Sequence, residues 1–199
     1  MEPKTTRTET AQARRQLIVE TAAACFIEQG FHQTSIRDIA KRAGVSLGNL
    51  YNHFENKAAL IAEIAMLEEQ DLDALEEQVS RISDPSKAFD KLVTLYIEYC
   101  YRPENIMLAA EISSEGLRNP DVRAGFMRNR SRLNSLIAKL VTEIPGKPGA
   151  GQNISPAVCA DFVVDLIEGL AMRSALGNRP PDRTEIGALK AVTRKIVQG

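Results

Sequence analysis

The sequence predicts an all-α protein of about nine helices. Apolar residues recur at intervals of three and four along almost the whole chain, which is the period of a helix that buries one face. No segment shows the strict alternation of apolar and polar residues that is typical of a half-buried strand. Three pairs of a capping residue and a proline, Asp84-Pro85, Asn119-Pro120 and Ser155-Pro156, mark helix starts. With 199 residues, the chain forms one domain or two small ones.

The first three expected helices follow one another closely. The first is expected over 11–29, and Gly30 ends it. The second is expected over 35–43 with Gly44 at its end, and the third, a short one, over 46–54. Helical spacing assigns to their buried faces Ile18, Ala22, Cys25, Phe26, Ile36, Ile39, Ala40, Ala43 and Leu50.

A long helix is expected from about residue 56, because an apolar stripe continues to Ile82 over about six turns. Acidic residues flank this stripe and indicate a solvated face. Residues 145–155, PGKPGAGQNIS, predict a flexible loop. The other helices are expected over 85–100, 103–117, 120–143, 156–176 and 182–198.

Composition describes an ordinary globular chain with a net charge of −1 and 44% hydrophobic residues. Residues 1–60 carry eight basic and six acidic side chains, whereas residues 61–110 carry four and eleven. This split is a weak indication of nucleic-acid binding at the basic end, and an ordinary fluctuation of charge explains it equally well.

Neither a membrane span nor a secretion signal is expected, since no long uncharged apolar run is present and residues 1–20 are polar. The three cysteines are odd in number and far apart, which favours reduced thiols in the cytoplasm. The two histidines have no partners at metal-ligand spacing, so no metal is expected. The glycine loop at 146–151 lacks the order of a phosphate-binding loop, and no catalytic triad can be assembled.

Residues 35–54, SIRDIAKRAGVSLGNLYNHF, have the pattern of a helix-turn-helix. Gly44 allows the sharp turn, Ala40 is small where two helices would cross, and Val45 and Leu50 can lock the pair. The second helix carries no carboxylate to repel phosphate, and its asparagines can pair with adenine. These residues favour DNA binding, with an ordinary short helical hairpin as the alternative.

Residues 14–64 resemble the DNA-binding domain of the TetR family of transcriptional regulators, in the segment ETAAACFIEQGFHQTSIRDIAKRAGVSLGNLYNHFENKAALIAEI. The matching positions are Phe26, Gly30, Phe31, Thr34, Ile39, Ala40, Gly44, Val45, Gly48, Tyr51, His53, Phe54, Lys57 and Leu60. A shorter segment, EISSEGLRNPDVRAGF at 111–126, is similar to the body of regulators related to the choline-responsive repressor.

The resemblance implies a three-helix DNA-binding head on a helical body that binds a small molecule and dimerises. The domains expected from it are a flexible arm at 1–9, a helix-turn-helix domain at 10–55, and a ligand-binding and dimerisation domain at 56–199. It implies no catalytic activity and no cofactor.

Ten residues are expected at the DNA. The resemblance places Arg37, Tyr51, His53 and Lys57 against phosphates, and Ser46, Gly48, Asn49 and Asn52 toward the groove. Thr34 and Ser35, either of which can cap the second helix, complete the set. Two alternatives stay open: Tyr51 packs under Phe54, or Lys57 is a solvated lysine in the first turn of its helix.

Aromatic, sulfur-containing and charged residues of the body are candidates for an effector pocket. In the alternative interpretation, the apolar ones among them are plain core residues at helical spacing. Few of them are charged, so a largely apolar effector is expected. The candidates are Tyr96, Tyr99, Cys100, Met107, Glu111, Phe126, Met127 and Arg130, with Glu111 and Arg130 orienting a polar group of the ligand.

The helix at 156–176 is apolar nearly all round and therefore needs partners on more than one side. The last helix offers a stripe with coiled-coil-like spacing, and two such helices from each of two chains would form a four-helix bundle. The expected dimer residues are Phe162, Val163, Leu166, Leu170, Ile186, Leu189, Val192 and Ile196. The alternative is a monomer whose last helix covers the apolar one.

Together these observations predict a cytoplasmic, homodimeric repressor that a small molecule releases from a palindromic DNA operator. An activator of the same fold is the first alternative, because sequence does not separate the two. A small helical enzyme would need a polar catalytic cluster, and none is visible. A helical adaptor would not explain the uncharged polar residues on the short helix after Gly44.

Overall fold

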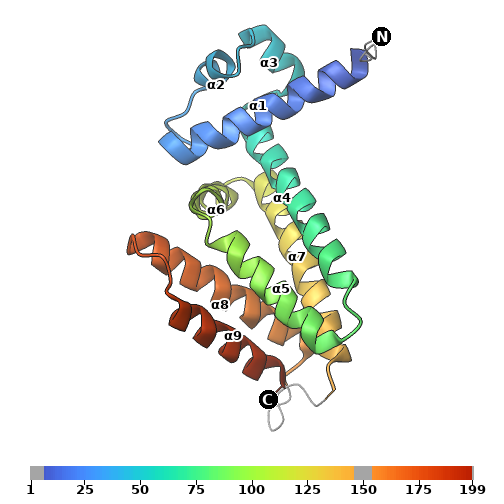
Figure 1. Ribbon diagram of the computed structural model, residues 1–199. Coiled ribbons are helices and arrows are strands. Elements are labelled where there is room, and N and C mark those ends of the chain that lie inside the picture. Colours follow the sequence, from blue (N-terminus) through green and yellow to red (C-terminus); the bar gives the residue numbers. More distant parts are fainter. Residues whose placement is uncertain (1–6, 146–153, 199) are drawn as a thin grey trace, which may run out of the picture. The chain divides into compact units, whose positions relative to one another are not determined.

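The computed structural model describes residues 7–145 and 154–198. In this part of the chain it contains nine α-helices and no strand, which confirms the expected fold class (Figure 1). The helices are α1 (Arg7–Gln29), α2 (Ile36–Arg42), α3 (Leu47–His53), α4 (Lys57–Ser80), α5 (Pro85–Cys100), α6 (Pro103–Gly116), α7 (Pro120–Glu143), α8 (Pro156–Leu176) and α9 (Arg183–Gln198). Most of the expected arm at 1–9 and loop at 145–155 lies outside the described residues.

Capping residues begin the helices where the sequence places them. The Ser35 side chain accepts the backbone N–H of Asp38, and the Asp38 carboxylate accepts the backbone N–H of Ser35. This reciprocal box satisfies two donors that a helix start otherwise leaves unpaired. Asp84 and Ser155 each cap a helix whose first residue is a proline.

Two glycines have left-handed backbones at the ends of the first two helices. Gly30, which follows α1, has a φ of +81°, and Gly44, between α2 and α3, has a φ of +67°. Residues with a Cβ atom rarely adopt these angles, so both turns depend on glycine. After α8 the left-handed residue is Asn178, with a φ of +45°, and not the glycine before it.

The chain divides into two compact units. Unit 1 comprises Met1–Glu68 together with Met107–Phe126, and unit 2 comprises Glu69–Ile106 together with Met127–Gly199. Unit 1 is therefore larger than the expected DNA-binding domain at 10–55, because it includes most of α6 and the start of α7.

Each unit has its own apolar core. In unit 1 the fully buried side chains include Phe26, Leu50 and Ile112, which come from α1, α3 and α6. In unit 2, the end of α4 and helices α5, α7, α8 and α9 supply the core, and α8 and α9 run side by side (Figure 1). Full burial of one such side chain contributes about 1.5–3 kcal/mol, so these cores hold the helices of each unit together.

Candidate nucleic-acid interface

Helices α2 and α3 form a helix-turn-helix in unit 1. Ile39 and Leu50 are fully buried and Ala40 nearly so, which fixes one helix against the other. The turn is closed by the backbone N–H of Val45, which donates to the carbonyl of Ala40 at 3.0 Å. The packing roles that the sequence assigns to Ala40 and Leu50 are therefore confirmed.

The outer face of α3 is polar and carries no carboxylate. Gly48, Tyr51 and Asn52 are exposed on it, and Asn49 and His53 are half-buried. Because Tyr51 is 50% exposed, its side chain is not packed in the core of the unit. The short helix thus offers uncharged hydrogen-bonding groups to a partner that carries negative charge.

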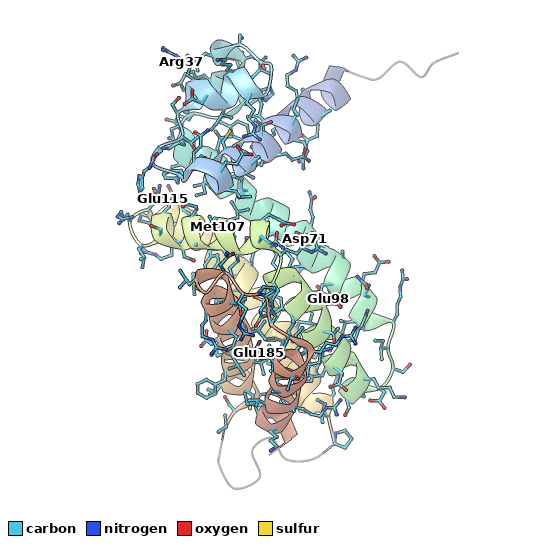
Figure 2. The ribbon with its side chains drawn as sticks, turned by 60° about the vertical axis from the view of Figure 1, so that its left-hand side comes forward. Arg37, Asp71, Glu98, Met107, Glu115 and Glu185 are labelled. Carbon is cyan, nitrogen blue, oxygen red and sulfur yellow. The ribbon has the colours of Figure 1, made fainter. Side chains whose placement is uncertain are left out.

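Three more of the expected DNA-binding residues lie at helix starts or on α2. Arg37 is exposed on the outer side of α2 (Figure 2). The hydroxyls of Ser35 and Ser46 each accept a backbone N–H, from Asp38 and Asn49, both at 3.1 Å. Both serines are exposed, so they cap their helices at the surface of the unit.

The structure corrects the expectation for Thr34. Its side chain is only 1% exposed, and its hydroxyl bonds to the carbonyls of Cys25 at 3.2 Å and Gly30 at 2.9 Å. These bonds satisfy a hydroxyl inside the core of unit 1. The side chain therefore supports the turn after α1 and has no surface to offer DNA.

Lys57 is turned inward, which corrects its expected place against phosphate. Its ammonium bonds to the carbonyls of Phe31 at 2.5 Å and Thr34 at 3.0 Å, and it approaches that of His32 at 3.5 Å. It also lies 4.3 Å from the centre of the Phe31 ring. Burial lowers the pKa of Lys57, and the charge of Glu115 opposes this shift. The flexible stem of lysine reaches back to the turn, so neither the phosphate contact nor the solvated side chain describes it.

Sequence reasoning missed Arg15, which supports the end of α3. Its guanidinium holds the Glu63 carboxylate with two bonds, at 2.8 and 2.9 Å, and donates to the carbonyl of His53 at 3.0 Å. It also lies 4.4 Å from the centre of the Phe54 ring. The three partners are 38 to 48 residues away in the chain, so no local motif could reveal this role.

The eight effector-pocket candidates are divided between the two units. Met107, Glu111 and Phe126 belong to unit 1, and the others belong to unit 2. In unit 1, Met107 is 46% exposed on α6 (Figure 2), and the Glu111 carboxylate accepts the backbone N–H of Phe31 at 2.7 Å. Phe126 packs half-buried against the core. Glu111 therefore has a partner within unit 1, which differs from the expected ligand-orienting role.

In unit 2 two of the candidates, Tyr96 and Arg130, belong to an ion cluster between helices. The Tyr96 hydroxyl donates to Glu168 at 2.6 Å, and Arg130 bonds to Glu168 at 2.6 Å and to Asp165. The Tyr96 and Tyr99 rings stack at 6.2 Å, and burial raises the pKa of Tyr96 well above its ordinary range. Cys100 is buried in the same core.

A groove of 370 Å³ lies along α7 and α8 in unit 2. Of the expected pocket residues, Arg130 and the exposed Met127 line it. The other walls are polar or small and come from Ser131, Asn134, Ser135, Ala138, Ala157 and Asp161.

The eight expected dimer residues differ in exposure. Val163 and Leu189 are buried in the core of their own chain, which corrects their assignment to an interface. Phe162 and Val192 are exposed, at 51% and 45%, and Leu166, Leu170, Ile186 and Ile196 are half-buried. Two exposed apolar residues of α8, Val158 and Leu176, are not among the eight expected dimer residues. Helical spacing showed which helices are apolar but not which side each turns to its own body.

No group of three or more potential metal ligands occurs in the described part of the chain. None of its helices is both long and apolar enough to cross a membrane. Cys25, Cys100 and Cys159 are buried and unpaired with one another.

The fold and the outer face of α3 define a helix-turn-helix DNA-binding protein. The sequence model of the family described as "Bacterial regulatory proteins, tetR family" matches residues 18–64. The transcriptional regulator UidR of Escherichia coli K12 is 30% identical over 161 residues, which are 80% of this chain and 81% of UidR. The chain belongs to the TetR family and is a helix-turn-helix transcriptional regulator.

Solved structures show the same fold at low identity. A transcriptional regulator from Rhodococcus sp. Rha1 is 20% identical with a TM-score of 0.77, over 92% of this chain and 95% of that one. A regulator from Saccharomonospora viridis, solved in complex with choline, is 20% identical with a TM-score of 0.75, over 94% of this chain and 96% of that one.

Proposed function

We propose that the protein is a dimeric repressor that binds a palindromic DNA operator through α3 and leaves it when a small molecule binds. The observation that carries this proposal is the exposed, carboxylate-free polar face of α3 at the end of a helix-turn-helix. The relatives are named as transcriptional regulators, and we extend this role to the chain in place of a catalytic one. Its operator would be reached in the cytoplasm.

Asn49 is the residue that we assign to base recognition. Its side-chain oxygen is buried and has no hydrogen-bond partner among the described residues. An unpaired buried acceptor is unfavourable by about 1–3 kcal/mol, so a turn toward an adenine edge would gain a partner for it. Arg37 of α2 and Tyr51 of α3, which are both exposed, would hold phosphates.

A second copy of the chain is the partner that we assign to the outer face of α8. Val158, Phe162 and Leu176 are exposed and share one side of this helix, since their spacing is close to whole helical turns. Val192 of α9 adds to the apolar surface. Isologous contact of two such faces would bury them and place two recognition helices at half-sites about 34 Å apart.

We place the effector site in unit 2, near the stacked Tyr96 and Tyr99 rings. A largely apolar molecule suits this apolar core, and the neighbouring cluster of Arg130 and Glu168 could orient one polar group. By mass action, the ligand would weaken operator binding only through its different affinities for the two states of the protein. Stabilisation in a thermal-shift screen by phosphorylated metabolites alone would contradict this assignment.

The test begins with selection of duplexes from a random pool by the wild-type protein, followed by footprinting on the DNA beside its own coding sequence. Asn49→Ala should change base preference at one position by about 1–3 kcal/mol. Arg37→Ala should weaken all sequences alike and lower the salt dependence by about one unit. Transcription in vitro from the footprinted promoter then separates a repressor from an activator. Failure of the wild-type protein to enrich any duplex would refute the proposed function.

A further inference from the structure

The turn between α1 and α2, residues 30–35, is held from two sides by charged side chains. On one side the Lys57 ammonium bonds to the carbonyls of Phe31 and Thr34. On the other side the Glu111 carboxylate accepts the backbone N–H of Phe31 at 2.7 Å. Both backbone groups of Phe31 are therefore bonded to side chains that lie 26 and 80 residues further along the chain.

The Phe31 side chain is fixed as well. It is 6% exposed, and its ring meets the Phe26 ring edge-on at 5.2 Å, with the Lys57 ammonium over its face. The other Glu111 oxygen lies beside Gly30, where a Cβ atom would stand 3.5 Å from it, an ordinary van der Waals distance. Glu111 thus contacts two consecutive residues of the turn, Gly30 and Phe31.

This turn leads directly into the helix-turn-helix. Ser35, which caps α2, is only four residues from Phe31, and the Thr34 hydroxyl fastens the stretch between them to the carbonyl of Gly30. A looser turn would have to be ordered again each time α2 and α3 bind DNA, and ordering a loop on binding reduces affinity.

Glu111 belongs to α6, which lies outside the DNA-binding domain expected from the sequence. Ile112, the next residue of α6, is fully buried in the core of unit 1, so this part of the helix is packed with the DNA-binding helices. We propose that Glu111 is a positioning residue for DNA recognition, because it holds the turn that leads into α2 and α3. This inference rests on the proposed function.

The experiment compares Glu111→Ala with Glu111→Gln on a duplex selected by the wild-type protein and on an unrelated duplex of equal length. Glu111→Ala should raise the Kd for the selected duplex about ten-fold, because a bond to a charged acceptor is lost. Its salt dependence should stay as in the wild type, since no phosphate contact is removed. Glu111→Gln should restore most of the affinity, because the amide oxygen can still accept from Phe31.

Hydrogen exchange measures the turn itself. Amides of residues 30–35 should exchange faster in Glu111→Ala and at the wild-type rate in Glu104→Ala, which removes an exposed carboxylate from the first turn of the same helix. Lys57→Met and Glu111→Ala should also be non-additive in DNA affinity, because both act through Phe31. Should Glu111→Ala not fold, Glu111→Asp, one methylene too short to reach Phe31, should show the same loss.

Wild-type affinity and exchange in Glu111→Ala would overturn the inference, and so would an equal loss in Glu111→Ala and Glu111→Gln. Both outcomes leave the proposed function standing, because the wild-type protein has by then selected its duplex. If the wild-type protein selects none, the proposed function fails instead.

Discussion

The charged side chains of the two units differ in the kind of group to which they bond. Unit 1 has ion pairs between side chains, such as Arg15 with Glu63, but Lys57, Arg15 and Glu111 also bond over long sequence separations to backbone groups of turns and helix ends. In unit 2, the long-range charged contacts of Arg130, Arg132 and Arg194 join side chains to side chains. Bonds to backbone groups fix the path of the chain, and bonds between side chains link helices whose paths are already set.

The difference follows from what each unit must hold in place. Two helices of seven residues and the turns around them bury little apolar surface of their own, so backbone bonds to distant side chains define their position. The long helices of unit 2 pack through a large apolar core, and exposed ion pairs add little to it. Position should therefore depend on single charged residues in unit 1, and on core packing in unit 2.

The largest expected effect is in the core of unit 2. Leu189 is 4% exposed, so Leu189→Glu buries a charge without a partner and should lower the free energy of unfolding by about 3–5 kcal/mol. Phe162→Glu, at a residue 51% exposed on the neighbouring helix, should leave the fold intact and produce a monomer. Chemical denaturation and sedimentation separate the two results. A stable dimer of Phe162→Glu would remove α8 from the proposed interface.

An intermediate effect is expected at Lys57 in unit 1. Lys57→Met keeps the apolar stem but leaves the carbonyls of Phe31 and Thr34 without this donor, which should cost about 1–3 kcal/mol of stability. DNA binding should weaken while its dependence on salt remains unchanged. Denaturation curves and a salt titration of the Kd measure both quantities. A drop of about one unit in the salt dependence would show that Lys57 contacts phosphate after all.

The smallest effect is expected from an ion pair of unit 2. Arg132 bonds to Asp73 and Glu76, both at 2.6 Å, and all three side chains are partly exposed to water. Arg132→Met should therefore change the stability by less than about 1 kcal/mol. Denaturation with and without added salt tests this value. A loss of stability as large as that of Lys57→Met would show that unit 2 depends on single charged residues as much as unit 1 does.

The helices and the helix-turn-helix could be predicted from the sequence. Their signals are local: the capping box of Ser35 and Asp38, the left-handed Gly44, and the apolar spacing that buries Leu50. Each of these depends on residues a few positions apart, and periodicity reports such relations directly.

The roles of several polar side chains could not be predicted in the same way. Lys57 was expected at DNA from the family resemblance, and Thr34 from its place at the start of the second helix, yet both serve the turn after α1. Glu111 was expected at a ligand and instead bonds to Phe31, 80 residues earlier. A long side chain such as that of Lys57 or Glu111 can bind partners that are distant in the sequence and close only in the folded chain. The side of α8 that is exposed also depends on how the folded helices pack, so periodicity alone does not reveal it.

The three buried cysteines can report on local opening of the helices that cover them. Cys25 lies in unit 1, and Cys100 and Cys159 lie in unit 2. Burial raises the pKa of the Cys25 and Cys159 thiols, so alkylating reagents should modify them only when the surrounding helices open. The alkylation rate of each cysteine then measures how often the helices around it open, and no cysteine has to be introduced by mutation. Loss of the Lys57 side chain should raise the alkylation rate of Cys25 and leave that of Cys159 unchanged.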